Sequence, residues 1–213
     1  MSSAAARTRT SRTRRSGRRR STARRRLRAV LAVTGLVAAG TAATMAGVGP
    51  LGDVVREFTL PLRHDDVIRQ QATEKGLDPA LIAAIIYEES RFRDQTSHAG
   101  ARGLMQVTPE TARFIARDSG GTAFVEGDLS SPQINIAYGS YFLRYLLEQY
   151  DGEVELAVAA YNAGETNVNR WLGEADGDFE AGDIPFPETR AYVENVLNRR
   201  EQYADHYADD LGL

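Results

Sequence analysis

A single glutamate at the end of an apolar run is the strongest candidate for chemistry in this chain. The run contains four apolar residues at helical spacing, Leu81, Ile82, Ile85 and Ile86. Glu89 follows the last three by seven, four and three positions, which places it on their face of a helix. A carboxyl group against such a face loses hydration, and its pKa rises toward neutral. That is the property a general acid in glycosidic bond cleavage needs.

The neighbouring Glu88 does not provide the opposed carboxylate of an ordinary glycosidase. Consecutive residues of a helix point about 100° apart, so Glu88 and Glu89 cannot face each other across one bond. Two-carboxylate hydrolases need a second Asp or Glu about 5 to 9.5 Å from the first. Two nearby stretches, Glu89 to Phe92 and Gly100 to Ala112, contain no convincing partner.

A glycine-rich segment follows Glu89. Gly100, Gly103 and the run from Gly103 to Gln106 place small residues and a polarizable Met105 beside an amide that can both donate and accept. Pro109 then opens a new helix. This composition suits the close approach of a bulky polar ligand.

Four short motifs occur in order between about Asp65 and about Tyr203. They are Glu89-Ser90-x-Phe92; Gly100-Ala101-x-Gly103-Leu104-Met105-Gln106 with Pro109-x-Thr111-Ala112; Ala160-Tyr161-Asn162-Ala163-Gly164; and Ile184-Pro185-x-x-Glu188-Thr189-x-x-Tyr192-Val193. Each motif alone is weak, but four in order at domain-scale separation are a strong signal. Together they resemble the catalytic domain of the soluble lytic transglycosylases, which have a goose-type lysozyme-like fold and cleave peptidoglycan.

The resemblance implies a reaction as well as a fold. The bond between N-acetylmuramic acid and N-acetylglucosamine would be cut without water, leaving a 1,6-anhydromuramyl end. Glu89 would act first as the acid and then as the base, with the substrate's acetamido group stabilising the anomeric centre. Action within glycan strands and action from their ends are both compatible with the motifs.

The resemblance also implies which residues bind substrate in the first two motifs. Ser90 and Gln106 would orient Glu89 or the sugar. Met105 would bound the pocket, with Gly103 beside it in the substrate-binding segment.

The last two motifs supply the remaining implied contacts. Tyr161 and Asn162 would contact the sugar and its acetamido group, and Tyr192 would bind the glycan. Glu188 stands at a predicted helix start, where capping of the helix and binding of the glycan explain it equally well.

Charge is distributed unevenly along the 213 residues. The first 28 residues contain twelve Arg and no acid, whereas the remainder has 29 acids against 14 bases, a formal charge of about −15. The tail, residues 1–28, has almost nothing to bury and is predicted to be disordered and cytoplasmic. An arginine-rich arm could bind nucleic acid, but its place directly before an apolar segment argues against that.

The apolar segment, residues 29–48, carries no charge and is long enough to cross a bilayer. It fits a retained transmembrane anchor and a cleaved secretion signal equally well, and in both cases the rest of the chain lies outside the membrane. We therefore expect a linker over residues 49–63, a catalytic domain over 64–205 and a tail over 206–213. The expected location is the cell envelope, either anchored or secreted.

The domain is predicted to be all-α, because no segment alternates with period two. In the longest helix, seven apolar and aromatic residues recur at three and four positions, and most of the aromatics are expected in the core; Trp171 is also expected there. The predicted helices are Asp65 to about Gly76, Pro79 to Glu89, Pro109 to about Asp118, Pro132 to about Tyr150, Glu153 to Ala163, Glu165 to Leu172, and Pro187 to about Tyr203. The recurring residues are Ile134, Ala137, Tyr138, Tyr141, Phe142, Tyr145 and Leu146.

Neither a metal nor another cofactor is expected. The chain has no Cys, and its three His residues are too scattered for zinc spacing; His98, the one nearest the motifs, is expected at the surface. The expected partners are peptidoglycan glycan strands and, through the N-terminal segment, the membrane. No nucleic acid is expected.

Two other functions remain open at the level of sequence. A muramidase would hydrolyse the same bond with water, using Asp94 or another loop acid as the base. A catalytically silent glycan-binding scaffold would keep the groove alone, although the presence of Glu89 with all four motifs argues against it.

Overall fold

The computed structural model describes residues 57–120, 125–175 and 179–213. The chain divides into two compact units, residues 1–58 and 59–213, and the fold described here is that of the second. The predicted tail at 1–28 and apolar segment at 29–48 lie outside the described residues. Within the described ranges, no helix is both long enough and apolar enough to span a bilayer.

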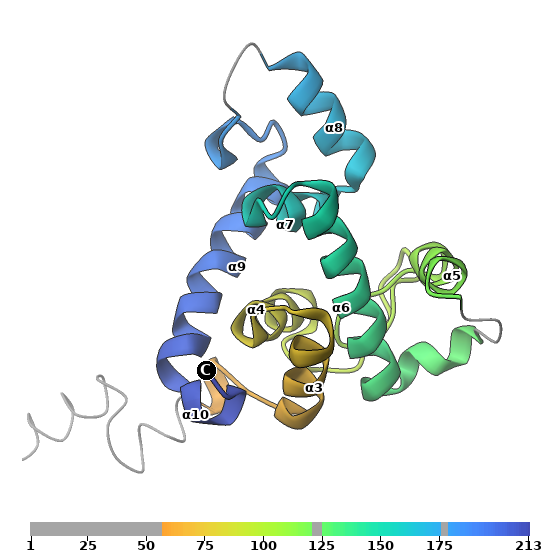
Figure 1. Cartoon of the computed structure of the whole chain (residues 1–213), viewed down its shortest axis with the longest axis vertical. Helices are drawn as coiled ribbons and strands as arrows, with labels where there is room; N and C mark the ends of the chain where they lie inside the picture. Colours follow the sequence, from red (N-terminus) through yellow and green to blue (C-terminus); the bar gives the residue numbers. More distant parts are fainter. Residues whose placement is uncertain (1–56, 121–124, 176–178) are drawn as a thin grey trace, which may run out of the picture. The chain divides into compact units, whose positions relative to one another are not determined.

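The named secondary-structure elements in the described part of the second unit are all helices, which confirms the predicted all-α fold (Figure 1). Two isolated bridges, Thr96 with Arg102 and Arg102 with Val107, are the β-type pairings between these residues. The α-helices are α3 (Asp65–Lys75), α4 (Pro79–Ser90), α5 (Pro109–Asp118), α6 (Pro132–Gln149), α7 (Val154–Ala163), α8 (Glu165–Glu174), α9 (Pro187–His206) and α10 (Ala208–Leu211); the 3-10 helices are η1 (Glu126–Ser130) and η2 (Ala181–Asp183).

Helix α4 lies at the centre of the fold. Its residues from Ala80 to Tyr87 are all buried, so it is apolar on every side, as expected of a helix enclosed by others. Figure 1 shows α3 beside it and the long helices α6 and α9 on its two sides, with α7 packed against both of them at one end. Helix α4 packs most extensively on α9. Because α4 carries Glu89, this packing determines the surroundings of the candidate acid.

The helices α4 and α5 start at the predicted prolines, and the residue before each proline caps the helix. Asp78 precedes Pro79, and its carboxylate accepts a hydrogen bond of 2.8 Å from the Ala80 amide. Thr108 precedes Pro109, and its hydroxyl accepts one of 3.1 Å from the Thr111 amide. At the other end of α4, Arg91 and Phe92 both have positive φ, 53° and 58°, which turns the chain sharply away after Glu89.

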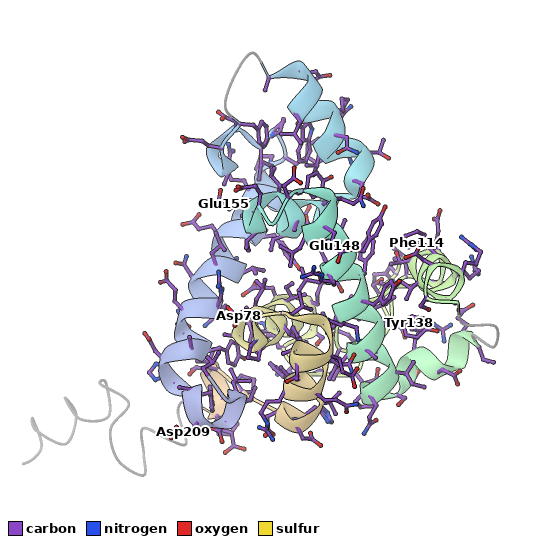
Figure 2. All side chains as sticks on the ribbon, in the orientation of Figure 1. Asp78, Phe114, Tyr138, Glu148, Glu155 and Asp209 are labelled. Carbon is purple, nitrogen blue, oxygen red and sulfur yellow. The ribbon has the colours of Figure 1, made fainter. Side chains whose placement is uncertain are left out.

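The face that α6 buries differs from the predicted one. Tyr138, Tyr141, Phe142 and Tyr145 are only partly buried and lie along the flank of the core. They flank it because small and polar side chains allow α6 to approach its neighbours more closely on another face. Figure 2 shows Phe114 of α5 and Tyr138 of α6 where these two helices face each other. The fully enclosed face contains Asn135, Ile136, Gly139, Ser140, Leu143 and Leu146.

The folded unit also extends past both predicted boundaries of the domain, residues 64 and 205. Leu60, in the predicted linker, is 4% exposed, and the Tyr203 hydroxyl donates to the carbonyl of Pro61 at 2.6 Å. In the predicted tail, Leu211 of α10 is 1% exposed, and Tyr207 donates to the Leu60 carbonyl at 2.8 Å. The two edges pack on each other, so the folded unit extends beyond the 64–205 boundary on both sides.

Candidate active site

Glu89 lies in the last turn of α4 and contacts α9. Its carboxylate Oε1 accepts a hydrogen bond of 2.6 Å from the hydroxyl of Tyr192. Its backbone carbonyl accepts another of 3.1 Å from the side-chain amide of Gln95, in the loop that follows the helix. The side chain is partly buried, between the apolar interior and solvent. The carboxyl group is therefore held in place while one side stays open to a ligand.

Burial raises the pKa of Glu89 from its ordinary 4.5 to about 7. The Tyr192 hydrogen bond opposes this effect, because it stabilises the charged form, and the nearby Glu88 carboxylate reinforces it. The resulting pKa near neutral is the one expected from the apolar stripe in the sequence. A carboxyl group with this pKa can both give and take back a proton at neutral pH.

Removal of the Tyr192 hydroxyl is expected to move the pH dependence of any reaction that needs protonated Glu89. In Tyr192→Phe, the lost hydrogen bond no longer favours the carboxylate, so the pKa of Glu89 rises. A hydrogen bond to a charged group corresponds to about one pKa unit. The basic limb of the pH–rate profile should shift to higher pH by that amount.

Tyr203→Phe is the matched control for this prediction. Tyr203 is also on α9 and buried, but its hydroxyl donates to Pro61 rather than to Glu89. The basic limb of the pH–rate profile of Tyr203→Phe should stay at the wild-type pH. An unmoved limb in Tyr192→Phe, or a shift to lower pH, would show that Tyr192 does not set the protonation of Glu89.

The third motif contacts the second through Tyr161. Its hydroxyl donates to the backbone carbonyl of Met105 at 2.9 Å. Burial raises the pKa of Tyr161 well above its ordinary value, and the Glu89 charge adds to the rise. The same two causes, with the direct hydrogen bond, raise the pKa of Tyr192. Both phenols therefore stay protonated, and they flank Glu89 as neutral groups.

Ser90 and Gln106 bond to backbone rather than to the Glu89 carboxylate. The Ser90 hydroxyl donates to the Ile86 carbonyl at 3.1 Å within α4. The Gln106 side-chain amide donates to the carbonyls of Gln95, at 3.0 Å, and Gly103, at 2.8 Å. Gln106 thereby ties the glycine-rich loop to the loop that leaves Glu89.

The last two motifs meet at Asn162. Its Oδ1 accepts a hydrogen bond of 2.8 Å from the hydroxyl of Thr189, which is 3% exposed. Asn162 itself is exposed, so its amide group is oriented yet accessible. Glu188 is exposed in the first turn of α9, where its charge favours the helix N-terminus. The structure thus bonds Tyr192 to Glu89, places Tyr161 within reach of the Glu89 charge, joins Asn162 to Thr189 of α9, and leaves Glu188 at a helix end.

Glu88 occupies a separate environment, as its helix position predicts. It forms an ion pair with Arg199 of α9, with Oε1 and Nε 3.5 Å apart. The Arg199 guanidinium also lies 4.1 Å from the centroid of the Tyr87 ring. Asp94, the alternative base, is exposed in the loop after α4. Trp171 is 3% exposed, which confirms its predicted place in the core.

A residue that sequence reasoning missed, Asn135, organises the glycine-rich loop. It is fully buried in α6 and bonds to three backbone groups of the loop and its neighbour η1. The signal in the sequence is a lone amide between Ile134 and Ile136, in a position that a helix of this composition would fill with an apolar residue.

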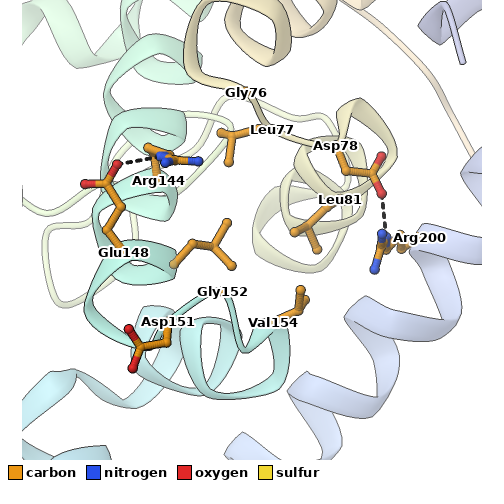
Figure 3. Close-up of a pocket in the computed structure, with 11 residues that line it drawn as sticks. Gly76, Leu77, Asp78, Leu81, Arg144, Glu148, Asp151, Gly152, Val154 and Arg200 are labelled. Atoms are coloured by element: carbon orange, nitrogen blue, oxygen red, sulfur yellow. Dashed lines mark hydrogen bonds and ion pairs between the residues drawn. The ribbon is translucent and has the colours of Figure 1, made fainter.

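Two cavities differ in their relation to Glu89. The nearer is small, about 50 Å³, and Gln106, Thr108, Thr111, Phe142 and Tyr161 are among the residues that line it. The larger, about 390 Å³, lies by the opposite end of α4 and is bordered by the ion pairs of Arg144 with Glu148 and of Arg200 with Asp78 (Figure 3). The smaller cavity adjoins the motif residues. Among the described residues, no cluster of His, Asp or Glu could hold a metal ion.

Comparison with known proteins identifies the same segment. The family model of the transglycosylase SLT domain matches residues 66–181. The soluble lytic murein transglycosylase of Escherichia coli K12 is 35% identical over 155 residues, which are 70% of this chain and 24% of that protein. The chain thus spans about a quarter of the length of such relatives.

Solved structures agree with the sequence comparison. An inactive glutamate-to-glutamine mutant of the lytic transglycosylase Slt from Pseudomonas aeruginosa superposes with a TM-score of 0.66 at 35% identity, over 70% of this chain and 25% of that one. The 70 kDa soluble lytic transglycosylase of Escherichia coli superposes with a TM-score of 0.67 at 32% identity, over 73% and 26%. The lysozyme-like helical fold expected from the four motifs is that of these structures.

Proposed function

Because this chain belongs to the transglycosylase SLT domain family, we propose that it is a peptidoglycan lytic transglycosylase. It cleaves the β-1,4 bond between N-acetylmuramic acid and N-acetylglucosamine and leaves a 1,6-anhydromuramyl end. The observation that carries this proposal is the state of Glu89, a partly buried carboxyl with a pKa of about 7, hydrogen-bonded to Tyr192. Such a group is protonated in a large fraction of molecules at neutral pH and can serve as the acid.

One carboxyl group serves both steps of the reaction. Protonated Glu89 gives its proton to the glycosidic oxygen as the bond from that oxygen to the anomeric carbon breaks. The resulting carboxylate then takes the proton of the C6 hydroxyl of the muramic acid, whose oxygen bonds to the anomeric carbon. Glu89 ends protonated, so no water is consumed. Tyr192 keeps the carboxylate in one orientation between the two steps.

The surroundings of Glu89 support a mechanism without a second carboxylate. Glu88 is held by Arg199 on another face of α4, and Asp94 is exposed in a loop. The substrate's acetamido group would instead stabilise the positive anomeric centre. Asn162, exposed and oriented by Thr189, is the residue we assign to that acetamido group.

The other implied contacts fit the walls of the site. We assign Tyr161 and Gln106 to the sugar, because the Met105 carbonyl holds the Tyr161 hydroxyl and the Gly103 carbonyl holds the Gln106 side-chain amide. Met105 and Gly103 are buried beneath this surface and shape it from inside, as Ser90 does on α4. Glu188 at the start of α9 is assigned to the outer part of the groove.

The product distinguishes this reaction from hydrolysis. Purified sacculi digested with the protein should release muropeptides that end in 1,6-anhydromuramic acid, one water lighter by mass spectrometry than hydrolysed ones. Digestion in heavy-oxygen water should leave these ends unlabelled. Mainly reducing ends that contain solvent oxygen would establish a muramidase instead, with Asp94 or another acid as the base. No release by the folded protein would favour a glycan-binding scaffold.

The substrate also determines where the protein works. Peptidoglycan strands lie outside the cytoplasmic membrane, and the arginine-rich tail before an uncharged segment orients the chain with its folded unit on that side. We assign the protein to the cell envelope, with residues 29–48 as an anchor or a secretion signal. The folded unit is acidic, so general charge attraction to an anionic wall is not expected, and specificity comes from the groove.

A further inference from the structure

Asn135 is a fully buried polar residue whose side chain bonds only to backbone. Its Oδ1 accepts a hydrogen bond of 2.7 Å from the Met105 amide. Its Nδ2 donates to the carbonyls of Arg102, at 2.8 Å, and Leu129, at 3.0 Å. The partners decide the amide's orientation, because an N–H can only donate and a carbonyl can only accept. One side chain therefore joins α6, the glycine-rich loop and η1.

Two glycines make room for this arrangement. A Cβ on Gly103 would lie 2.2 Å from Nδ2 of Asn135, so only glycine fits there. A Cβ on Gly139 would lie 2.4 Å from the sulfur of Met105. Asn135 and Gly139 are one helical turn apart, on the same face of α6. The first residue holds the backbone of Met105, and the second accommodates its side chain.

The loop held in this way forms one wall of the site. The Met105 carbonyl accepts the hydrogen bond of Tyr161, and the Glu89 charge contributes to the raised pKa of this tyrosine. The next residue, Gln106, has a positive φ of 46° and bonds to the loop that follows Glu89. A shift of the Met105 backbone would therefore move both Tyr161 and Gln106 relative to the carboxylate.

We propose that Asn135 is a positioning residue of the active site, which acts through Met105 on Tyr161 and Gln106. It touches neither Glu89 nor the substrate. This inference rests on the proposed function in one respect, because the effect of Asn135 on the rate can be measured only if the protein cleaves glycan. The effect of Asn135 on the loop does not depend on that function, because Met105 is held whether or not substrate is present.

The direct test compares Asn135→Ala and Asn135→Asp with the wild type. Alanine removes all three hydrogen bonds, whereas aspartate keeps the acceptor for Met105 and loses both donors. On soluble glycan strands, kcat should fall about 100-fold in the alanine variant, the loss expected when a group is displaced by about 1 Å. The KM should change much less, and circular dichroism at the assay temperature should show folded protein.

Ser140→Ala is the matched control. Ser140 is also fully buried in α6, and its hydroxyl has no hydrogen-bond partner among the described residues. Its loss should leave kcat unchanged. If the Asn135 variants do not fold, Gly139→Ala tests whether the position of Met105 controls the rate. This substitution displaces Met105 and leaves the side chain of Asn135 in place. The kcat should then fall while α6 stays intact.

Amide hydrogen exchange provides a readout that does not depend on activity. The Met105 amide should lose protection in Asn135→Ala while the amides of α4 keep theirs. Unchanged kcat in a folded Asn135→Ala, a loss equal to the unfolded fraction, or unchanged Met105 protection would each overturn the proposal. A wild type that releases no glycan fragments would refute the proposed function instead, and Met105 exchange would then decide this inference alone.

Discussion

Glu89→Gln is expected to abolish glycan cleavage. Glutamine matches the shape of the glutamic acid and can still accept a hydrogen bond from Tyr192, but it can neither give the first proton nor take the second. General acid and general base catalysis each contribute about 10² to 10⁴ in rate, so the loss should be at least 10³-fold. The measurement is release of muropeptides from sacculi.

The fold should survive this change, with a characteristic dependence on pH. The pKa of Glu89 is about 7 in the folded protein and 4.5 in its ordinary state. A raised carboxyl pKa means that burial of the charged form lowers the free energy of unfolding. This loss is zero well below pH 4.5, grows as the pH rises, and is complete above pH 7. The complete loss is at most about 3 to 4 kcal/mol, since each of the roughly 2.5 pKa units corresponds to about 1.36 kcal/mol. Glu89→Gln should therefore unfold at a higher temperature than the wild type at pH 8 and near the same temperature at pH 4.

Glu88→Gln serves as the control on the same helix. It removes a partly buried ion pair with Arg199, which contributes about 1 kcal/mol or less, and leaves the acid in place. Most of the cleavage activity should remain. If both variants lose activity equally while both remain folded at the assay temperature, the acid has been assigned to the wrong glutamate or the two act jointly.

Gly103→Ala is expected to have the largest effect on stability. Gly103 has φ of 74°, where a Cβ costs about 1 to 2 kcal/mol. The new Cβ would also lie 2.2 Å from Nδ2 of Asn135 and 2.6 Å from the carbonyl oxygen of Leu129. Overpacking of this kind costs about 1 to 3 kcal/mol. Denaturant unfolding should show a loss of about 2 to 5 kcal/mol, with lower activity from the displaced loop.

Gly100→Ala separates the backbone term from the packing term. Gly100 belongs to the same motif and has φ of 83°, but a Cβ there would meet nothing within 4 Å. Its alanine variant should lose only the backbone cost of about 1 to 2 kcal/mol. Equal losses at the two positions would mean that the contact of Gly103 with Asn135 is relaxed at no cost.

The sequence alone predicted most of the local structure. The helix starts at Pro79 and Pro109 were predicted, and in the structure the side chains of Asp78 and Thr108 cap them. The place of Glu89 against the apolar interior followed from its spacing to Ile82, and its raised pKa followed in turn. Four motifs were enough to indicate the family, because their order and separation are properties of the chain itself.

Only the tertiary structure decided which distant side chains meet. Tyr192 and Glu89 are 103 positions apart, and their hydrogen bond exists because α9 packs along α4. The buried face of α6 contains Asn135, which bonds to the loop, and Gly139, which leaves room for the Met105 side chain, rather than the most apolar stripe. The periodicity of apolar residues indicates which faces a helix could bury, because residues three and four positions apart lie on the same face. The choice among its faces is a property of the whole core, where the close fit to neighbouring elements determines which face is enclosed.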